Sequence, residues 1–224
     1  MKQGTARLAH AGDLRRAAAP LAIGERAHLL VRLASAPWER IVEALDVRGA
    51  DSLLDVGCGP GLLAFLAERA GFVGRYLGVD TDERKVARAR RWLGETERRR
   101  FRAGRVEDVA ERGFARVALV DVLYLVPPAG REAIVNACAA RMVPGGLLGA
   151  VTSGGGPAWK RALDRVQEGL AVAAGITRGA AVAPCDGASI ASLFSAAGLR
   201  DVAVSDAGAG YVHGFEIVRG RVPS

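Results

Sequence analysis

The chain has 224 residues, of which 50% are hydrophobic and 25% charged, and its formal net charge at pH 7 is +7. This length and composition fit one globular core, and they exclude a disordered chain or two ordinary domains. No segment approaches the roughly 20 apolar residues of a membrane-spanning helix, and the N-terminal stretch MKQGTARLAHAGDLRR lacks the apolar core of a secretion signal. We therefore expect a bacterial protein of the cytoplasm.

The positive charge is concentrated between Arg84 and Arg105, and the rest of the chain is nearly neutral. Such a cluster can bind nucleic acid, phosphate or anionic lipid, but Trp92 and Phe101 are its only aromatic residues and no nucleic-acid motif accompanies it. We interpret the cluster as a solvated helix face, which makes a nucleic-acid partner unlikely and leaves peripheral contact with anionic lipid open. The sequence indicates no oligomeric state.

The three cysteines, Cys58, Cys138 and Cys185, lie far apart and form no CxxC pair. Neither a disulfide framework nor a zinc site is indicated, so we expect reduced thiols and no metal. For Cys58 the simplest interpretation is a small apolar residue that fills space, because no histidine or second cysteine is near it in the sequence.

The elements follow in a regular order. Helical patterns at residues 24–35 and 37–46 come first, and from Ser52 onward short apolar runs alternate with helical patterns. The predicted strands are 52–56, 76–80, 100–104, 117–123 and 147–152, and the predicted helices between them are 60–70, 82–93 and 129–142. This alternation is typical of a doubly wound α/β fold with a mostly parallel sheet.

The pattern changes after Thr152. A loop, SGGGP, precedes two helical patterns, AWKRALDRVQEGLAVAAG and ASIASLFSAAG, and two strand-like runs, LRDVAVS and GYVHGFEIVRG, follow them. The two runs are separated by only DAGA, which predicts a hairpin at one edge of the sheet.

A glycine-rich turn follows the first predicted strand. In DVGCGPG the glycines Gly57, Gly59 and Gly61 have the spacing G-x-G-x-G, and Leu62 stands where a dinucleotide fingerprint has its third glycine. No Gly-Lys-Ser/Thr sequence follows, so a Walker phosphate loop is excluded. Asp55, just before the turn, would repel a pyrophosphate but could hold an ammonium group, directly or through water.

Further acidic residues follow the next two predicted strands. Asp80 can accept hydrogen bonds from both ribose hydroxyls, a role that would suit NAD equally well. Val106, Glu107 and Asp108 can border an adenine, and a carboxylate there can accept a hydrogen bond from the exocyclic amine of the adenine. S-adenosylmethionine has an amino-acid tail, a sulfonium, a ribose and an adenine but no phosphate, so it fits these carboxylates as a cofactor.

With these residues in view, the chain from about Val47 to Val218 resembles the class I S-adenosylmethionine-dependent methyltransferases, small-molecule subgroup. The resemblance rests on LLDVGCGPG, GVDTDERKVARAR and DVLYLVPPAGREAIVNACAARMVPGGLL, and one departure is Gly104-Arg105, where relatives often carry Gly-Asp. It implies a Rossmann-like, seven-stranded sheet with an antiparallel last strand, and cofactor contacts that include Cys58, Thr81 and Asp121. We expect residues 1–46 to form a helical cap on a domain of residues 47–224, with a helical insertion around 153–190.

Three residues are candidates for the reacting end of the site. The resemblance places Tyr124 near the substrate or the sulfonium, although it can equally be a packed tyrosine. His28 and His213 are candidate general bases, since imidazole titrates near neutral pH, and each can instead be a packing residue. Trp38, Trp159 and helix 158–172 are expected to build or cover the substrate pocket.

Methyl transfer from a sulfonium is an in-line displacement that depends mainly on positioning and on excluding water. DVLY stands in place of the Asn/Asp-Pro-Pro-Tyr/Phe signature for planar amino nitrogens, so we expect O-, C- or N-methylation of a small, apolar or lipid-like metabolite. The alternatives left open are a cofactor-binding regulator or cyclase that transfers no methyl group, an RNA methyltransferase and, less well supported, a dehydrogenase.

Overall fold

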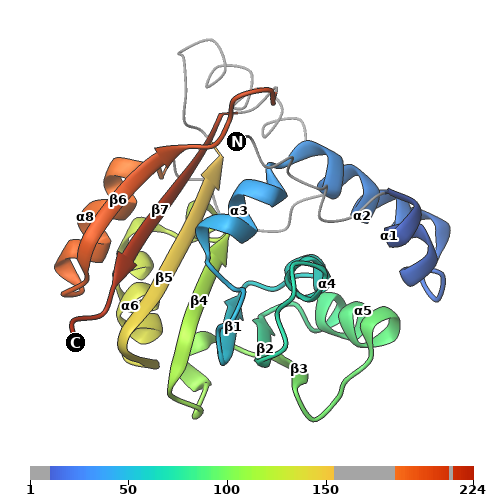
Figure 1. The fold of residues 1–224 in the computed structure, drawn as a ribbon, viewed down its shortest axis with the longest axis horizontal. Helices are drawn as coiled ribbons and strands as arrows, with labels where there is room; N and C mark the ends of the chain where they lie inside the picture. The colour runs from blue at the N-terminus through green and yellow to red at the C-terminus, as the bar shows by residue number, and fades with distance from the viewer. Residues whose placement is uncertain (1–10, 154–184, 212–213) are drawn as a thin grey trace.

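Seven strands form one sheet in the computed structural model, which describes residues 11–153, 185–211 and 214–224 (Figure 1). The strands have the order β3-β2-β1-β4-β5-β7-β6. Their bounds are β1 Ser52–Val56, β2 Arg75–Asp80, β3 Arg99–Ala103, β4 Phe114–Val120, β5 Met142–Ser153, β6 Arg200–Asp206 and β7 Phe215–Arg221. Strands β1 to β5 pair in parallel, whereas β7 is antiparallel to β5 and β6, as predicted.

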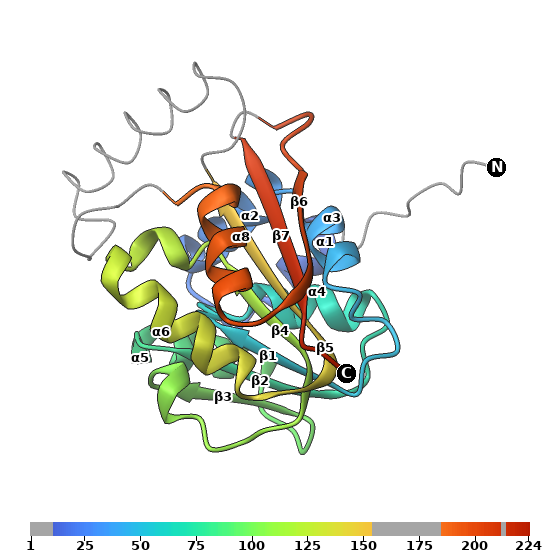
Figure 2. The ribbon, with the colours of Figure 1, turned by 90° about the vertical axis from the view of Figure 1, so that its left-hand side faces the viewer.

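Helices cover both faces of this sheet. Their bounds are α1 Ala11–Ala17, α2 Ile23–Ser35, α3 Trp38–Ala44, α4 Leu62–Arg69, α5 Glu83–Leu93, α6 Pro128–Ala139 and α8 Gly187–Ala196, with short 3₁₀ turns η1 Val106–Asp108 and η2 Leu123–Leu125. Helices α3 and α4 pack on one face, and α6 and α8 pack on the other (Figure 2). Helix α5 shares the core of α3 and α4 through Val86, Ala89 and Trp92. The strand order reverses between the neighbouring strands β1 and β4, and α/β sheets place their ligands at the carboxyl ends of the strands at such a point.

Strand β4 shows why the predicted strands are apolar on both sides. Ala118 packs in the core shared with α3 and α4, while Val117 and Leu119 pack in the core shared with α6, and all three are fully buried. Successive side chains point to opposite faces of a strand, so a strand covered twice needs apolar residues at every position.

Several boundaries differ from the sequence prediction. Strand β4 ends at Val120 rather than at residue 123, because Asp121 has a left-handed backbone (φ 56°) and Leu123–Leu125 form η2. Helix α1 was not predicted, whereas the predicted hairpin is formed by β6 and β7, with β6 at the edge of the sheet. Trp159, His213, helix 158–172 and most of the predicted insertion lie outside the described residues.

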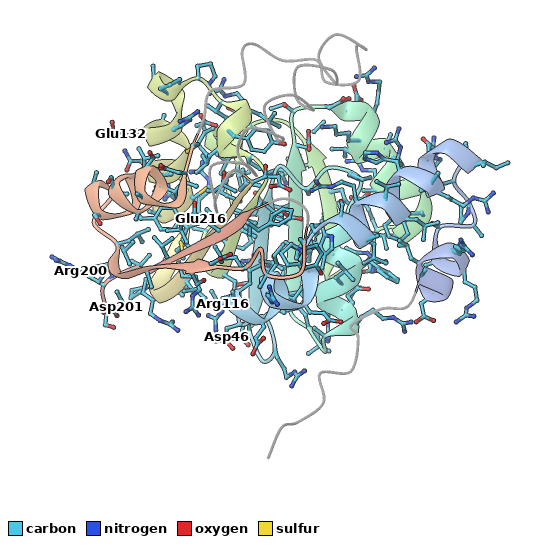
Figure 3. All side chains as sticks on the ribbon, turned by 90° about the horizontal axis from the view of Figure 1, so that it is seen from above. Asp46, Arg116, Glu132, Arg200, Asp201 and Glu216 are labelled. Atoms are coloured by element: carbon cyan, nitrogen blue, oxygen red, sulfur yellow. The ribbon has the colours of Figure 1, made fainter. Side chains whose placement is uncertain are left out.

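An ion pair joins the end of the N-terminal helices to the sheet. Seen from above, Arg116 of β4 and Asp46, which follows α3, lie together (Figure 3), with Nη2 to Oδ2 at 2.7 Å. Arg116 Nε also donates to the Asp46 carbonyl at 2.9 Å. Asp46 has a positive φ of 47°, so the side chain of Arg116 stabilises a sharp turn at the boundary expected for the cap.

None of the helices formed by residues 11–153, 185–211 and 214–224 combines the length and apolar character of a bilayer-spanning segment.

Candidate active site

The glycine-rich turn after β1 is fastened to the end of β2. The amides of Gly57 and Cys58 donate to the carbonyl of Val79 at 2.7 and 3.0 Å. The carboxylate of Asp80 accepts from the Gly59 amide through Oδ2 and from the Asp82 amide through Oδ1, both at 2.8 Å. Asp80 therefore shapes the turn as well as facing it.

The same hydrogen bonds decide which ligands the turn can hold. Phosphate loops bind their ligand with free backbone N–H groups that point at the anion. Here the amides of Gly57, Cys58, Gly59 and Gly61 all donate inside the protein, and Pro60 has no N–H group. The turn consequently offers no row of donors to a pyrophosphate, and this argues against a dinucleotide more directly than the missing third glycine does.

Glycine is needed at the three positions of the turn for different physical reasons. A Cβ on Gly57 would lie 2.4 Å from Val122 Cγ2, and one on Gly61 would lie 2.8 Å from Leu93 Cδ1, so close packing requires both glycines. Gly59 has a positive φ of 54°, but a Cβ there would meet nothing within 4 Å. Gly59 is thus the glycine whose outer side is open.

Helix α5 contacts the glycine-rich turn through Trp92. The indole of Trp92 donates to the carbonyl of Pro60 at 2.6 Å and packs against Phe65 with 5.4 Å between ring centroids. Trp92 belongs to α5, which follows β2, whereas the turn joins β1 to α4. The position of the turn therefore depends on contacts between the β1–α4 unit and the β2–α5 unit.

Asp55 is buried directly beside the turn. Its Oδ2 accepts a hydrogen bond of 2.6 Å from the hydroxyl of Tyr76, and only 2% of the residue is exposed. Burial raises the pKa of Asp55 to about 7, the bond from Tyr76 opposes this shift, and the charge of Asp80 adds to it. Tyr76 was not predicted, because its contact with Asp55 arises from the parallel pairing of β1 with β2.

The third carboxylate, Asp121, follows β4. Arg32 of α2 donates through Nη2 to Asp121 Oδ2 at 2.8 Å, while Oδ1 is buried and has no hydrogen-bond partner among the described residues. A buried oxygen without a donor costs about 1–3 kcal/mol. This oxygen is therefore a natural acceptor for a bound ammonium or hydroxyl group.

Arg32 is itself held in place. Its guanidinium lies 5.9 Å from the centroid of the Trp38 ring, and the Trp38 indole donates to the Arg32 carbonyl at 2.8 Å. Tyr124, which is half-buried in η2, lies close enough to interact electrostatically with this guanidinium. Arg32 and its contacts were not predicted, since nothing in the local sequence links α2 to the end of β4.

His28 lies on the same helix and is exposed. Desolvation of the imidazole by neighbouring atoms, followed by the positive charges of Arg32, Arg88 and Lys85, lowers its pKa. The imidazole is consequently neutral at pH 7, the form that can accept a proton. The structure thus brings His28 and Tyr124 near one guanidinium, whereas His213 lies outside the described residues.

The segment after β3 approaches Asp80, because the Gly104 amide donates to the Asp80 carbonyl at 3.0 Å. In η1 the side chain of Val106 is buried, Glu107 is paired with Arg105 at 2.7 Å, and Asp108 is exposed. The Arg105 guanidinium is the main cause that lowers the pKa of Glu107.

A buried arginine fixes the turn η1 itself. Arg141 donates to the backbone carbonyls of Glu107, Val109 and Ala137 at 2.7 to 2.8 Å. Thr81, after Asp80, is exposed.

The basic cluster is largely paired within the protein. Its ion pairs are Arg84–Asp82, Arg88–Glu25, Arg91–Glu25, Arg90–Glu95, Arg99–Glu68, Arg102–Glu111 and Arg105–Glu107. Arg88, Arg91, Arg99 and Arg102 pair with carboxylates of other segments, whereas the other three pairs are local. On α5, Arg84, Lys85, Arg90 and Arg91 are exposed, in keeping with a solvated helix face.

These features fit S-adenosylmethionine. Three carboxylates, Asp55, Asp80 and Asp121, line the carboxyl ends of β1, β2 and β4, and the turn between them offers no phosphate donors. One buried oxygen of Asp121 lacks a donor among the described residues. A cofactor with an ammonium group and a ribose diol, and without phosphate, matches this set. Fold and site together define a class I S-adenosylmethionine-dependent methyltransferase fold.

Comparison with known proteins gives the same class. Residues 53–146 match the family described as a methyltransferase domain. An uncharacterized RNA methyltransferase of Streptomyces coelicolor is 38% identical over 98 residues, which cover 42% of this chain and 21% of the relative. The chain thus spans about a fifth of the length of that relative.

Two solved structures share the fold. Human N-acetylserotonin methyltransferase in complex with S-adenosylmethionine superposes with a TM-score of 0.69 at 16% identity, over 96% of this chain and 57% of that one. The [4+2]-cyclase SpnF superposes with a TM-score of 0.61 at 17% identity, over 83% of this chain and 80% of that one. At these identities the likeness concerns the fold alone.

Proposed function

We propose that the protein transfers a methyl group from S-adenosylmethionine to a small, apolar or lipid-like molecule by in-line displacement. When bound, the cofactor supplies a methyl group on a positively charged sulfur. The chain's own residues would bind it: Asp80 would accept the ribose hydroxyls, Asp55 and Asp121 would face the ammonium group, and η1 would border the adenine. Thr81 and Cys58 are further contacts at the turn.

The position of α2 is the observation that most supports a small molecule, rather than a polymer, as the methyl acceptor. Glu25, near its start, accepts from Arg88 Nε and Arg91 Nη2 of α5 at 2.8 and 2.7 Å, and Arg32, near its end, donates to Asp121 after β4. Figure 1 shows α2 above α4 and α5, at the end toward which β1 and β4 point. A helix fastened on both sides of the site leaves less room for a polymer than for a metabolite, so we propose residues 1–46 as a cap.

The residues near α2 also define the reacting end. Tyr124 would contact the acceptor, and His28, neutral at pH 7, would accept its proton through an imidazole nitrogen where the acceptor must lose one. An acceptor that carries no such proton would need only to be positioned against the methyl group in a site from which water is excluded. His213 and the insertion around residues 153–190 belong to this proposal as expected contributors to the pocket.

Incubation of the protein with S-adenosylmethionine labelled in its methyl group tests this function. We expect label to appear in a small, organic-extractable product from a metabolite extract, and Arg32→Ala to lose more activity than Arg26→Ala, on the same helix. Label found in RNA, with none in the metabolite fraction, would contradict the proposal.

A second candidate is an RNA methyltransferase, favoured by the 38% identity to the Streptomyces coelicolor protein. Against it stand the ion pairs that occupy most of the basic cluster. The SpnF likeness leaves a cyclase, which would bind the cofactor and transfer no label, as a third outcome of the same experiment.

A further inference from the structure

Tyr76, the buried hydrogen-bond partner of Asp55, has no role in the function proposed so far. Tyr76 is the second residue of β2, and its hydroxyl lies 2.6 Å from Asp55 Oδ2. Both residues are at least 97% buried, and the Tyr76 ring packs edge-on against Phe101 with 5.6 Å between centroids. The hydroxyl is therefore fixed by the core and cannot turn away from the carboxylate at little cost.

The charges around this pair do not stabilise the Asp55 carboxylate. Asp80, at the end of β2, faces it with the same charge, and Glu68 of α4 acts on the Tyr76 hydroxyl. Burial raises the pKa of the neighbouring Cys58 thiol, which is therefore neutral, and Lys85 of α5 is a cation near that thiol. Among the described residues no guanidinium or ammonium group forms an ion pair with Asp55.

We infer that Tyr76 is a positioning residue for the cofactor: its hydroxyl holds the Asp55 carboxylate beside the glycine-rich turn as an oriented, charged acceptor for the ammonium group of the amino-acid tail. The inference rests on the proposed function, because it needs a ligand with such a tail. It assigns a role to a residue of β2 that the glycine-rich motif does not contain.

This arrangement has a consequence for pH. The Asp55 pKa of about 7 in the free protein means that the carboxyl group is largely neutral at pH 6 and largely charged at pH 8. A ligand with an ammonium group should bind more weakly as pH falls below 7, by up to about tenfold per pH unit. Removal of the Tyr76 hydroxyl raises the pKa further and moves this loss to higher pH.

The test compares two probes by calorimetric titration between pH 5.5 and 8.5. S-adenosylhomocysteine carries the amino-acid tail, and 5′-methylthioadenosine carries the same adenosine and thioether without it. In Tyr76→Phe we expect S-adenosylhomocysteine to bind about tenfold or more weakly at pH 7, the equivalent of one hydrogen bond to a charged group. The deficit should shrink toward pH 8.5, and 5′-methylthioadenosine should change by less than about twofold.

Asp55→Asn supplies the matched control, because its amide oxygen still accepts from Tyr76 but carries no charge. We expect this variant to bind S-adenosylhomocysteine weakly at every pH, and Tyr76→Phe to add little to it. Equal affinity of Tyr76→Phe and the unmodified protein for S-adenosylhomocysteine would overturn the inference. Equal losses for both probes would also overturn it, since the hydroxyl would then support only the fold. Failure of the unmodified protein to bind either probe would instead refute the proposed function.

Discussion

At the scale of single residues, the site depends on carboxylates that serve the protein before any ligand arrives. Asp80 already accepts two backbone amides, and Asp55 already accepts a hydroxyl. A carboxylate has about four acceptor positions, so these bonds leave room for ligand groups. Asp121 differs, because one of its oxygens is buried and has no donor within the part of the chain that the structure describes. The protein therefore carries a local cost that a bound ligand would relieve.

The first prediction concerns Asp55 and stability. Its pKa rises from 3.8 to about 7 on folding, so ionisation opposes folding progressively from about pH 4 to pH 7. The full cost above pH 7 is about 4 kcal/mol, taken as an upper bound. Asp55→Asn should therefore unfold at higher urea concentration than the unmodified protein at pH 8, and this gain should shrink toward pH 5. The exposed Asp51→Asn serves as control, and a gain independent of pH would refute the prediction.

The second prediction separates two glycines of the turn. Gly57→Ala combines a left-handed backbone with a clash 2.4 Å from Val122 Cγ2 and should cost about 2–4 kcal/mol of the free energy of unfolding. Gly59→Ala meets no atom within 4 Å and should cost only about 1 kcal/mol, from its positive φ. Urea unfolding of both variants measures the difference. Equal costs would show that the packing of Gly57 against Val122 contributes nothing.

At the scale of elements, α2 joins parts of the chain that are distant in sequence. Its Glu25 contacts α5, its Arg32 contacts the end of β4, and Leu29 is buried between these two positions. Each ion pair of Glu25 alone is worth at most about 1 kcal/mol, because both partners keep some contact with solvent. The pair of Arg32 with Asp121 is more buried on its carboxylate side. Small energies at the Glu25 end suit the proposal that α2 opens to admit a substrate.

The third prediction tests the contact between α2 and α5. Glu25→Gln removes the charge shared by Arg88 and Arg91, so α2 should open more often. Amide hydrogen exchange in α2 should speed up by roughly fivefold, equivalent to about 1 kcal/mol, while exchange in α4 stays unchanged. Glu39→Gln, an exposed residue of α3, provides the control. Equal effects of the two substitutions would contradict a specific contact of α2 with α5.

The sequence predicted elements better than it predicted their contacts. Strand β1 lies at residues 52–56 as predicted, because a doubly covered strand leaves an unbroken apolar run. Helix α1 was missed because its 7 residues bury only Leu14, too short a segment for a period of 3.6 to appear. The end of β4 was placed too late, because apolar Val122 and Leu123 continue the strand pattern past the left-handed Asp121.

For the site, too, the residues at strand ends could be predicted, but the contacts of their side chains could not. The acidic residues at strand ends follow from the topology, so Asp55, Asp80 and Asp121 could be named from sequence order. Tyr76 and Arg32 could not, since their partners lie 21 and 89 positions away and the contacts depend on side-chain reach. Their proposed roles, like those of the three acids, await measurement.

At the scale of the whole molecule, the formal net charge is +7, but seven of the ten basic residues between Arg84 and Arg105 form ion pairs. The fourth prediction is that a fluorescein-labelled RNA hairpin binds no more tightly than about 10⁻⁴ M at roughly 150 mM salt, the weak end of non-specific binding. Arg100→Glu should leave this value unchanged. Tighter binding that falls steeply with salt, and that Arg100→Glu weakens, would favour the RNA methyltransferase.

The measurement that tests the central claim most directly is calorimetric titration of the protein with S-adenosylhomocysteine and, separately, with NADH. The account predicts a micromolar dissociation constant, about −8 kcal/mol, for the former alone. Asp80→Ala should abolish this binding while the exposed Glu83→Ala retains it, with the fold of each variant checked by circular dichroism. Binding of NADH alone, or of neither ligand, would contradict the account.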